Sequence, residues 1–222
     1  LLTQTVPGYL HLLQRYTRAV RARNALLKRK PIDEAALDSF TAEVIQLGNQ
    51  LIAHRHDLMP ALVPRIQAAH KRIAPNGEEL RVELIPSVKK DFIAELELTR
   101  DRERKNGATI IGPHRDEIAL LLHDRSAADY ASEGQKRTIA IALKIAQAEH
   151  LTEIHGAPPV LLIDDVMGEL DEHRRQGFLP LLEKCGSGRG QVFMTCTEEN
   201  WPQNLSKVLQ RWKIHNGTLQ PC

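Results

Sequence analysis

Apolar residues recur at steps of three and four along the first thirty positions, which is the spacing that places side chains on one face of an α-helix. The first thirty residues are therefore predicted to form an amphipathic helix, which Pro31 ends because proline lacks the amide hydrogen that a helix needs. The apolar stripe consists of Tyr9, Leu12, Leu13, Tyr16, Ala19, Val20, Leu26 and Leu27.

A second stripe of the same spacing runs from Leu37 to Leu58, and Asp33 is placed to cap its start. Pro60 and Pro64 are predicted to break this helix, so that a shorter helix follows over about 65–73. Long helices with short links predict that residues 1–78 form an all-helical arm.

Strand-like alternation begins after residue 79. The segment LRVELIP, residues 80–86, alternates between apolar and polar positions as a half-buried strand does. A charged helix is predicted over about 89–104. The segment NGATIIGPHRDEIALLLHD, residues 106–124, then predicts two strands joined by a turn at Gly112–Pro113.

From Ser132 onward, helices and apolar strands alternate. A helix is predicted from Gln135 to about His150, and the run PPVLLI, residues 158–163, is typical of a parallel strand buried on both faces. A helix over about 171–184 and a strand at QVFMT, residues 191–195, complete the pattern. The predicted fold class is α/β, with a partial sheet and flanking helices in residues 79–222 beside the helical arm.

Charge is distributed unevenly, although the formal net charge of the 222 residues is only +2. The first thirty residues hold seven arginines and lysines and no acidic residue. This basic arm can meet nucleic-acid phosphates, with Arg18, Arg21 and Arg23 as candidates for DNA contact, or it can be an ordinary solvated helix face. Trp201 and Trp212 are predicted to be packing residues rather than base-stacking platforms.

The three cysteines, Cys185, Cys196 and Cys222, form no closely spaced pair of the kind that binds zinc. A reduced, cytoplasmic protein is therefore expected. No run reaches the roughly 18 apolar residues that a membrane span requires, so no membrane association is expected.

Two adjacent aspartates, Asp164 and Asp165, follow the most apolar run of the chain. In open parallel sheets, ligands bind beyond the carboxyl ends of the strands. If the two side chains point to opposite sides, Asp164 can hold Mg²⁺ while Asp165 orients or polarises a water beside a phosphate. The alternative is that both are solvated loop residues or helix caps.

The segment SEGQKRT, residues 132–138, combines a helix start with features that suit phosphate binding. Ser132 and Gln135 have the spacing of a capping box, which is a common structural device. Gly134 permits close approach to the backbone at a helix N-terminus, and Lys136 and Arg137 add positive charge. The same residues therefore predict either a helix cap alone or a phosphate clamp.

Three motifs in fixed order give this chain a specific resemblance. SEGQ resembles the signature motif of ABC-type ATPases of the SMC kind, VLLIDD resembles their Walker B strand, and GELD resembles their D-loop. Together with IGPHRDE, residues 111–117, and the helical segment QRYTRAVRARNALLK, they resemble the RecF family of bacterial recombination-mediator ATPases. The resemblance covers nearly the whole chain.

This resemblance implies a protein that binds ATP and Mg²⁺ and forms a homodimer around the nucleotide. It also implies binding to single-stranded or gapped DNA, and partners similar to RecO and RecR that help to load recombinase. By the same resemblance, Asp164 holds Mg²⁺, Asp165 activates water, Asp171 lies at the dimer interface and Thr197 occupies the switch position. The residues that would reach the nucleotide of the other subunit are Ser132, Gly134, Gln135 and Arg137.

The turn GPHRDE carries two further candidates. His114 and Arg115 could contact phosphate or DNA, as the resemblance suggests. They could equally form an ion pair with Asp116 or Glu117 that fixes the turn.

One motif of the family is absent, because no glycine in this chain is followed by lysine as the phosphate loop G-x-x-x-x-G-K-[ST] requires. The Gly-rich segment at 186–190 follows the two aspartates and is interpreted as a loop. In ABC-type chains the phosphate loop precedes the signature, so it is expected upstream of Leu1. The chain is then expected to be an N-terminally truncated piece that hydrolyses ATP poorly by itself.

Three other functions remain open from the sequence. The chain could be an ABC-type ATPase with another task, such as a transporter subunit or a chromosome organiser. It could be a non-catalytic DNA-binding or scaffold protein of the same fold. It could also be a metal-dependent nuclease that uses Asp164 and Asp165 with a third acid, Glu169 or Asp171.

Overall fold

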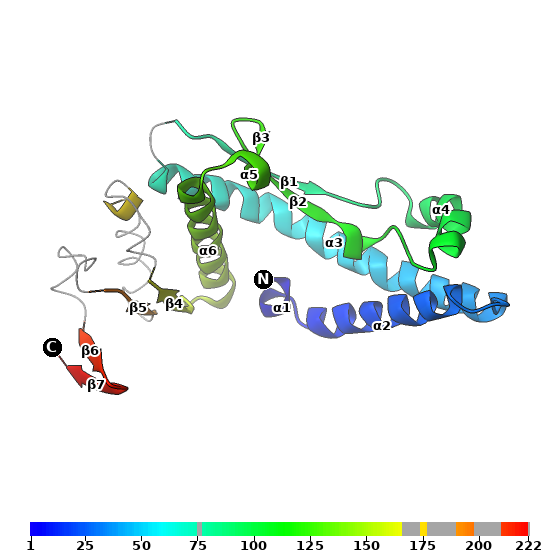
Figure 1. The fold of residues 1–222 in the computed structure, drawn as a ribbon, viewed down its shortest axis with the longest axis horizontal. Coiled ribbons are helices and arrows are strands. Elements are labelled where there is room, and N and C mark those ends of the chain that lie inside the picture. The colour runs from blue at the N-terminus through cyan, green and yellow to red at the C-terminus, as the bar shows by residue number, and fades with distance from the viewer. Residues whose placement is uncertain (75–76, 166–173, 177–189, 198–209, 222) are drawn as a thin grey trace.

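A long helical hairpin runs along one side of the molecule (Figure 1). The computed structural model describes residues 1–74, 77–165, 174–176, 190–197 and 210–221. After the single turn α1 (Leu2–Thr5), helix α2 (Tyr9–Leu27) packs along helix α3 (Glu34–Ile73). The predicted first helix is thus divided in two, with Gly8 in a left-handed conformation at the start of α2.

The hairpin is held by the apolar faces that the sequence pattern predicts. Tyr16 of α2 and Val44, Leu47 and Leu51 of α3 are buried in one cluster. Asp33 caps α3 by accepting a hydrogen bond from the amide of Ala36 at 3.0 Å. The helical arm is therefore built as its apolar periodicity indicates.

Helix α3 does not break at its prolines, so the prediction of two helices in this region is wrong. It continues through Pro60 and Pro64 to Ile73. Both prolines lie one turn apart on the exposed side, where water can bond the carbonyls that lose their helical partners. The apolar side of the same turns packs in a cluster around Ile66, and this packing outweighs the local cost of the prolines.

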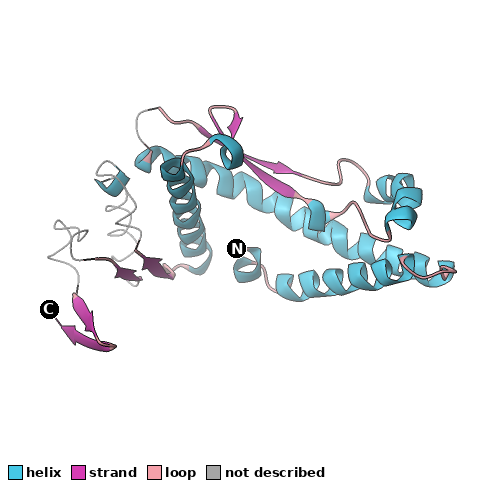
Figure 2. Cartoon of the chain, viewed as in Figure 1, coloured by secondary structure: helices cyan, strands magenta, loops and turns pink. Residues whose placement is uncertain are grey.

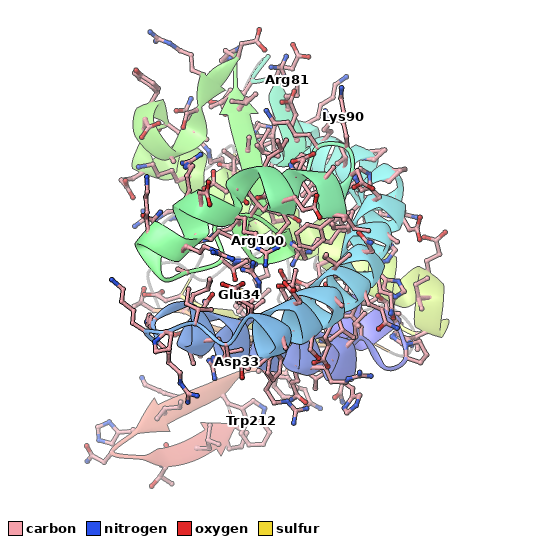
Figure 3. The ribbon with its side chains drawn as sticks, turned by 90° about the vertical axis from the view of Figure 1, so that its right-hand side faces the viewer. Asp33, Glu34, Arg81, Lys90, Arg100 and Trp212 are labelled. Atoms are coloured by element: carbon pink, nitrogen blue, oxygen red, sulfur yellow. The ribbon has the colours of Figure 1, made fainter. Side chains whose placement is uncertain are left out.

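Helix α4 (Phe92–Asn106) packs against the arm although it follows the predicted boundary at residue 78. Phe92 and Leu96 join the apolar cluster of α2 and α3. On the outer side, Arg100 lies 3.1 Å from Glu34 at the start of α3, and Figure 3 shows the two side chains facing each other. The division into domains at 78/79 stays a prediction.

A small antiparallel sheet follows α3 (Figure 1). Strand β1 (Leu80–Ile85) pairs with β2 (Glu117–Leu122), and the short β3 (Arg125–Ser126) adds to β2. The turn before β2 is a short 3₁₀ segment, η1 (Pro113–Arg115).

Only the second of the two strands predicted within 106–124 forms as expected. Residues 107–111 are not a strand, because side chains bind their backbone amides instead. Asn24 accepts from the amide of Thr109 at 2.7 Å, and Glu103 accepts from the amide of Ile110 at 2.9 Å.

Helix α6 (Glu133–His155) follows the single turn α5 (Ala127–Tyr130) and packs against α3. It leads to two parallel strands, β4 (Val160–Asp164) and β5 (Gln191–Thr195), and to a hairpin of β6 (Trp212–His215) and β7 (Thr218–Pro221) (Figure 2). Of the predicted helix over 171–184, only 174–176 are described, and these are helical.

The parallel pair is confirmed, but burial on both faces is not. Ile163 of β4 and Met194 of β5 pack toward a core formed by α3 and α6. On the opposite face Leu162 is 79% exposed and Phe193 is 58% exposed. Trp212, predicted to be a packing residue, is 54% exposed, and Trp201 lies outside the described residues. In the part of the chain that is described, no helix has the length and apolar character needed to cross a membrane.

Candidate nucleotide and nucleic-acid sites

The two aspartates lie at the carboxyl end of β4, beside the end of β5. Asp164 is paired in register with Thr195, and the hydroxyl of Thr195 donates a hydrogen bond to the Asp164 carboxylate at 2.5 Å. Asp164, Asp165 and Thr195 are all exposed. The parallel register thus presents a carboxylate and a hydroxyl side by side at the sheet edge where ligands bind.

Asp165 is not a strand residue, which corrects the expectation that the two side chains alternate across a strand. Its φ of 46° is left-handed, a conformation that aspartate tolerates better than most residues. The Asp165 amide donates to the Thr195 carbonyl at 3.1 Å and is also 3.0 Å from the Thr195 hydroxyl. The chain therefore turns at Asp165, and Thr195 fixes that turn.

The exposed oxygens of this edge fit Mg²⁺. Magnesium prefers oxygen ligands and usually takes one or two carboxylates, with water and substrate phosphates completing its shell. Asp164 supplies such a carboxylate, and the Thr195 hydroxyl steadies it. Among the described residues no three His, Cys, Asp or Glu side chains gather as a metal site. Glu169 and Asp171 lie outside the described residues.

Thr197, the proposed switch residue, is exposed two positions after the end of β5. Cys196, which lies between the end of β5 and Thr197, packs partly against the core of α3 and α6. Burial raises the pKa of the Cys196 thiol, while the Arg211 guanidinium opposes this shift and the Asp165 carboxylate adds to it. The resemblance pointed to Thr197, and the structure adds Thr195, which contacts both aspartates.

The SEGQ segment forms a complete capping box at the start of α6. The Ser132 hydroxyl accepts from the Gln135 amide at 3.3 Å, and the Gln135 side chain accepts from the Ser132 amide at 2.9 Å. Ser132 and Arg137 are exposed. Of the described residues, an added Cβ at Gly134 would meet only the Arg174 guanidinium, at 3.8 Å, which is an ordinary van der Waals distance.

Two residues that the sequence reasoning missed support this helix start. Glu78 accepts a hydrogen bond from the Gln135 side-chain amide at 3.2 Å. Arg174 donates to the Thr138 hydroxyl at 2.7 Å and lies 3.7 Å from Glu78. Neither residue lies within a motif whose spacing predicts such contacts, so the sequence offers no signal for them.

The GPHRDE turn is docked on the arm through Asp116. Arg55 of α3 forms an ion pair with Asp116 at 2.5 Å and also donates to the Pro113 carbonyl. The other Asp116 oxygen accepts from the Ser87 amide at 2.9 Å. The expected ion pair that fixes the turn therefore exists, but its cation is Arg55 rather than His114 or Arg115.

His114 is held by the arm as well. Its Nδ1 lies 2.7 Å from the Tyr16 hydroxyl, and its Nε2 lies 3.3 Å from the Thr109 carbonyl. Loss of solvent around the ring lowers the pKa of His114, and burial raises the pKa of Tyr16. Arg115 is exposed beside this anchored ring.

The basic residues of α2 separate into two groups. Arg15, Arg18 and Arg21 are exposed, as are the lysines and arginine at 28–30. Arg23 is not on that face, which corrects its selection as a DNA-contact candidate: it is 1% exposed. Its guanidinium pairs with buried Glu103 at 2.7 Å, because a buried charge needs a partner.

Several curated proteins that resemble this chain carry the same name. No family model matches the chain, but curated proteins do. The chain is 33% identical over 250 residues to the DNA replication and repair protein RecF of Rippkaea orientalis, covering 100% of this chain and 64% of that protein. It is 35% identical over 236 residues to RecF of Symbiobacterium thermophilum, covering 98% of this chain and 61% of that protein.

Solved structures agree with these relatives. A structure of the recombination mediator protein RecF with ATP, from the RecFOR pathway, superposes with a TM-score of 0.80 at 27% identity. That match covers 100% of this chain and 60% of the other. The chain thus spans about three fifths of the length of the relatives that it matches. Over the length that it shares with them, this chain belongs to the RecF family.

Proposed function

We propose that this chain is part of a DNA replication and repair ATPase that binds ATP with Mg²⁺, forms a homodimer on the nucleotide and acts on gapped or single-stranded DNA as a recombination mediator. RecO-like and RecR-like proteins are its proposed partners. The observation that carries the proposal is the signature segment: a complete capping box with an exposed serine and a half-buried glycine at the start of a 23-residue helix.

A nucleotide bound by a second copy of the protein suits this helix start. The first amides of a helix carry a partial positive charge and lack helical partners, so they favour phosphate. Ser132, Gly134 and Arg137 would face the phosphates from this subunit. Ser132 and Arg137 are exposed and Gly134 has no side chain, which suits an approach of the nucleotide from another subunit.

The aspartate edge of β4 supplies the groups for hydrolysis in this proposal. Asp164, steadied by Thr195, would hold Mg²⁺, which when bound neutralises phosphate charge. Asp165 would orient the attacking water, from a turn that its own amide bonds to β5 hold in place. Asp171 is proposed to lie at the dimer interface, and Thr197 is proposed to occupy the switch position.

DNA would bind along the exposed basic face of α2. A helix of 19 residues spans about 28 Å at 1.5 Å per residue, which is close to the rise of eight base pairs of duplex. Arg18 and Arg21 lie on this face, and His114 and Arg115 are proposed as further contacts.

The decisive experiment is the Asp165→Asn substitution in the native protein. We expect ATP turnover to fall by about 10²- to 10⁴-fold, because asparagine cannot accept a proton from water or polarise it as a carboxylate does. ATP binding, measured by equilibrium dialysis, should persist. Asp129→Asn, which alters an exposed carboxylate on α5, is the matched control. Unchanged turnover in Asp165→Asn would remove Asp165 from the reaction.

A second substitution tests the role of the signature segment in the dimer. Ser132→Arg places a bulky cation at the helix start, so it should abolish ATP-dependent dimerisation while the monomer still binds ATP. Sedimentation of the native protein with and without ATP measures this directly. Loss of ATP binding by the monomer would contradict a role toward the nucleotide of the other subunit.

A further inference from the structure

Glu78 lies in the connection between arm helix α3 and strand β1, and its side chain is mostly buried. One of its carboxylate oxygens accepts from the Gln135 side chain at 3.2 Å and lies 3.7 Å from the Arg174 guanidinium. Gln135 is half of the capping box that begins α6. Glu78 therefore links the base of the arm to the helix start that carries the signature segment.

Arg174 reinforces the same turn of α6 from another part of the chain. Its Nε donates to the Thr138 hydroxyl at 2.7 Å, and its guanidinium lies over Gly134. Glu78 and Arg174 are each only 13% exposed in their side chains, so their attraction is less screened by water than a surface pair. Without Glu78, this cation would lose an anionic neighbour in a mostly dry position.

The second oxygen of Glu78 faces the arm. It lies 4.0 Å from Nε2 of His70, a 1% exposed residue in the last turn of α3. Both atoms are buried, and neither has a hydrogen-bond partner among the residues that the structure describes. Buried polar atoms are almost always bonded, so this pair marks a place where a small movement gains a hydrogen bond. Glu78 therefore contacts the start of α6 with one oxygen and lies beside the end of α3 with the other.

We propose that Glu78 is a positioning residue that couples the arm to the signature segment. It holds Gln135 and Arg174 so that the first turn of α6 keeps the geometry that the nucleotide of the second subunit meets. A displacement of the end of α3 would change the contact of Glu78 with that turn. This inference rests on the proposed function for its nucleotide-dependent part.

The test compares Glu78→Ala with Glu79→Ala in the native protein. Glu79 is the adjacent glutamate and is exposed, so its loss controls for the change in charge. With the non-hydrolysable analogue AMP-PNP, Glu78→Ala should weaken dimerisation about tenfold, because a hydrogen bond to a charged group contributes on the order of one such factor. Binding of AMP-PNP by the monomer should be unchanged. Equal dimerisation in the two variants, or a parallel loss of monomer binding, overturns the proposal.

A conservative variant separates positioning from general loss of fold. Glu78→Gln keeps the oxygen that accepts from Gln135 but loses the attraction to Arg174, so dimerisation should fall between that of the wild type and that of Glu78→Ala. If Glu78→Ala does not fold, a double-mutant cycle of Glu78→Gln with Arg174→Gln decides. A coupling of about threefold or more supports the proposal, and additive effects overturn it.

Hydrogen exchange tests Glu78 independently of the nucleotide. The amides of the first turns of α6 should exchange about tenfold faster in Glu78→Ala than in Glu79→Ala, because local opening of that turn becomes easier. If the wild-type protein fails to dimerise with AMP-PNP, the proposed function fails while this measurement still decides the role of Glu78. Unchanged exchange in Glu78→Ala overturns the coupling.

Discussion

Charged residues are buried and paired where α2, α3 and α4 meet. At the carboxyl edge of β4 they are exposed and carry like charges. At the junction Arg23 and Glu103 are almost fully buried, 2.7 Å apart, and the Arg23 guanidinium also donates to the hydroxyls of Thr109 and Thr41. At the β4 edge Asp164 and Asp165 are exposed, with like charges side by side. A buried, fully paired charge indicates a structural role, whereas exposed like charges favour a ligand that offsets their repulsion.

The largest effect is expected from breaking the buried pair. Glu103→Ala leaves the Arg23 charge buried without its anion, so the free energy of unfolding should fall by about 3–5 kcal/mol. Denaturant unfolding followed by circular dichroism measures it. Glu97→Ala, which removes an exposed glutamate of the same helix, should change stability by less than about 0.5 kcal/mol. Equal effects of the two variants would mean that burial of the pair does not govern stability.

A smaller loss is expected at the GPHRDE turn. Asp116→Ala removes the carboxylate that bonds both Arg55 and the Ser87 amide, and should lower the free energy of unfolding by about 2 kcal/mol. Faster proteolysis within residues 107–116 provides a local readout. Glu117→Ala, at the exposed neighbouring position, is the control and should leave both quantities unchanged. If Asp116→Ala is equally neutral, the turn is held by its backbone alone.

Acidification should act on the buried end of α3. Burial lowers the pKa of His70 from its ordinary value near 6.5. Between that lowered pKa and pH 6.5, His70 binds more protons in the unfolded chain than in the folded one. Its contribution to the free energy of unfolding is therefore fully present above pH 6.5 and is lost as the pH falls through this window. One such histidine contributes a slope of at most about 1.4 kcal/mol per pH unit. Melting curves of the wild type and His70→Gln should converge in acid, and parallel curves would contradict this account.

The smallest effect on stability is expected from exposed charges on α2, the helix that also carries buried Arg23. Replacing Arg18 and Arg21 by glutamine should leave stability unchanged but weaken DNA binding, and should flatten its salt dependence by about 0.9 in logarithmic slope per lost phosphate contact. Fluorescence anisotropy at several salt concentrations measures both quantities. Arg102→Gln on α4 is the control. An unchanged affinity and slope would identify the basic face of α2 as ordinary solvated surface.

Local patterns predicted most of the helices because the spacing of apolar residues along the chain shows an amphipathic face directly. Helix α2, most of helix α3, the capping box at Ser132 and the strands β4 and β5 all follow from spacing or composition. Continuity through Pro60 and Pro64 could not be predicted, because the packing of the apolar face decides it. The missing strand before Gly112 could not be predicted either, because Asn24, 85 positions away, binds the Thr109 amide, and Glu103 binds the Ile110 amide.

The candidate functional residues also divide into those that the sequence predicted and those that only the tertiary structure revealed. The sequence alone determined that two carboxylates end an apolar strand, that a serine and a glutamine cap a helix, and that the first thirty residues are basic. Only the tertiary structure decided that Arg23 is a buried structural residue, that Thr195 supports Asp164, and that Glu78 and Arg174 hold the start of α6. The physical reason is that the burial of a side chain and its hydrogen-bond partners depend on segments that are far apart in the chain. A local sequence pattern does not show which of these segments come into contact.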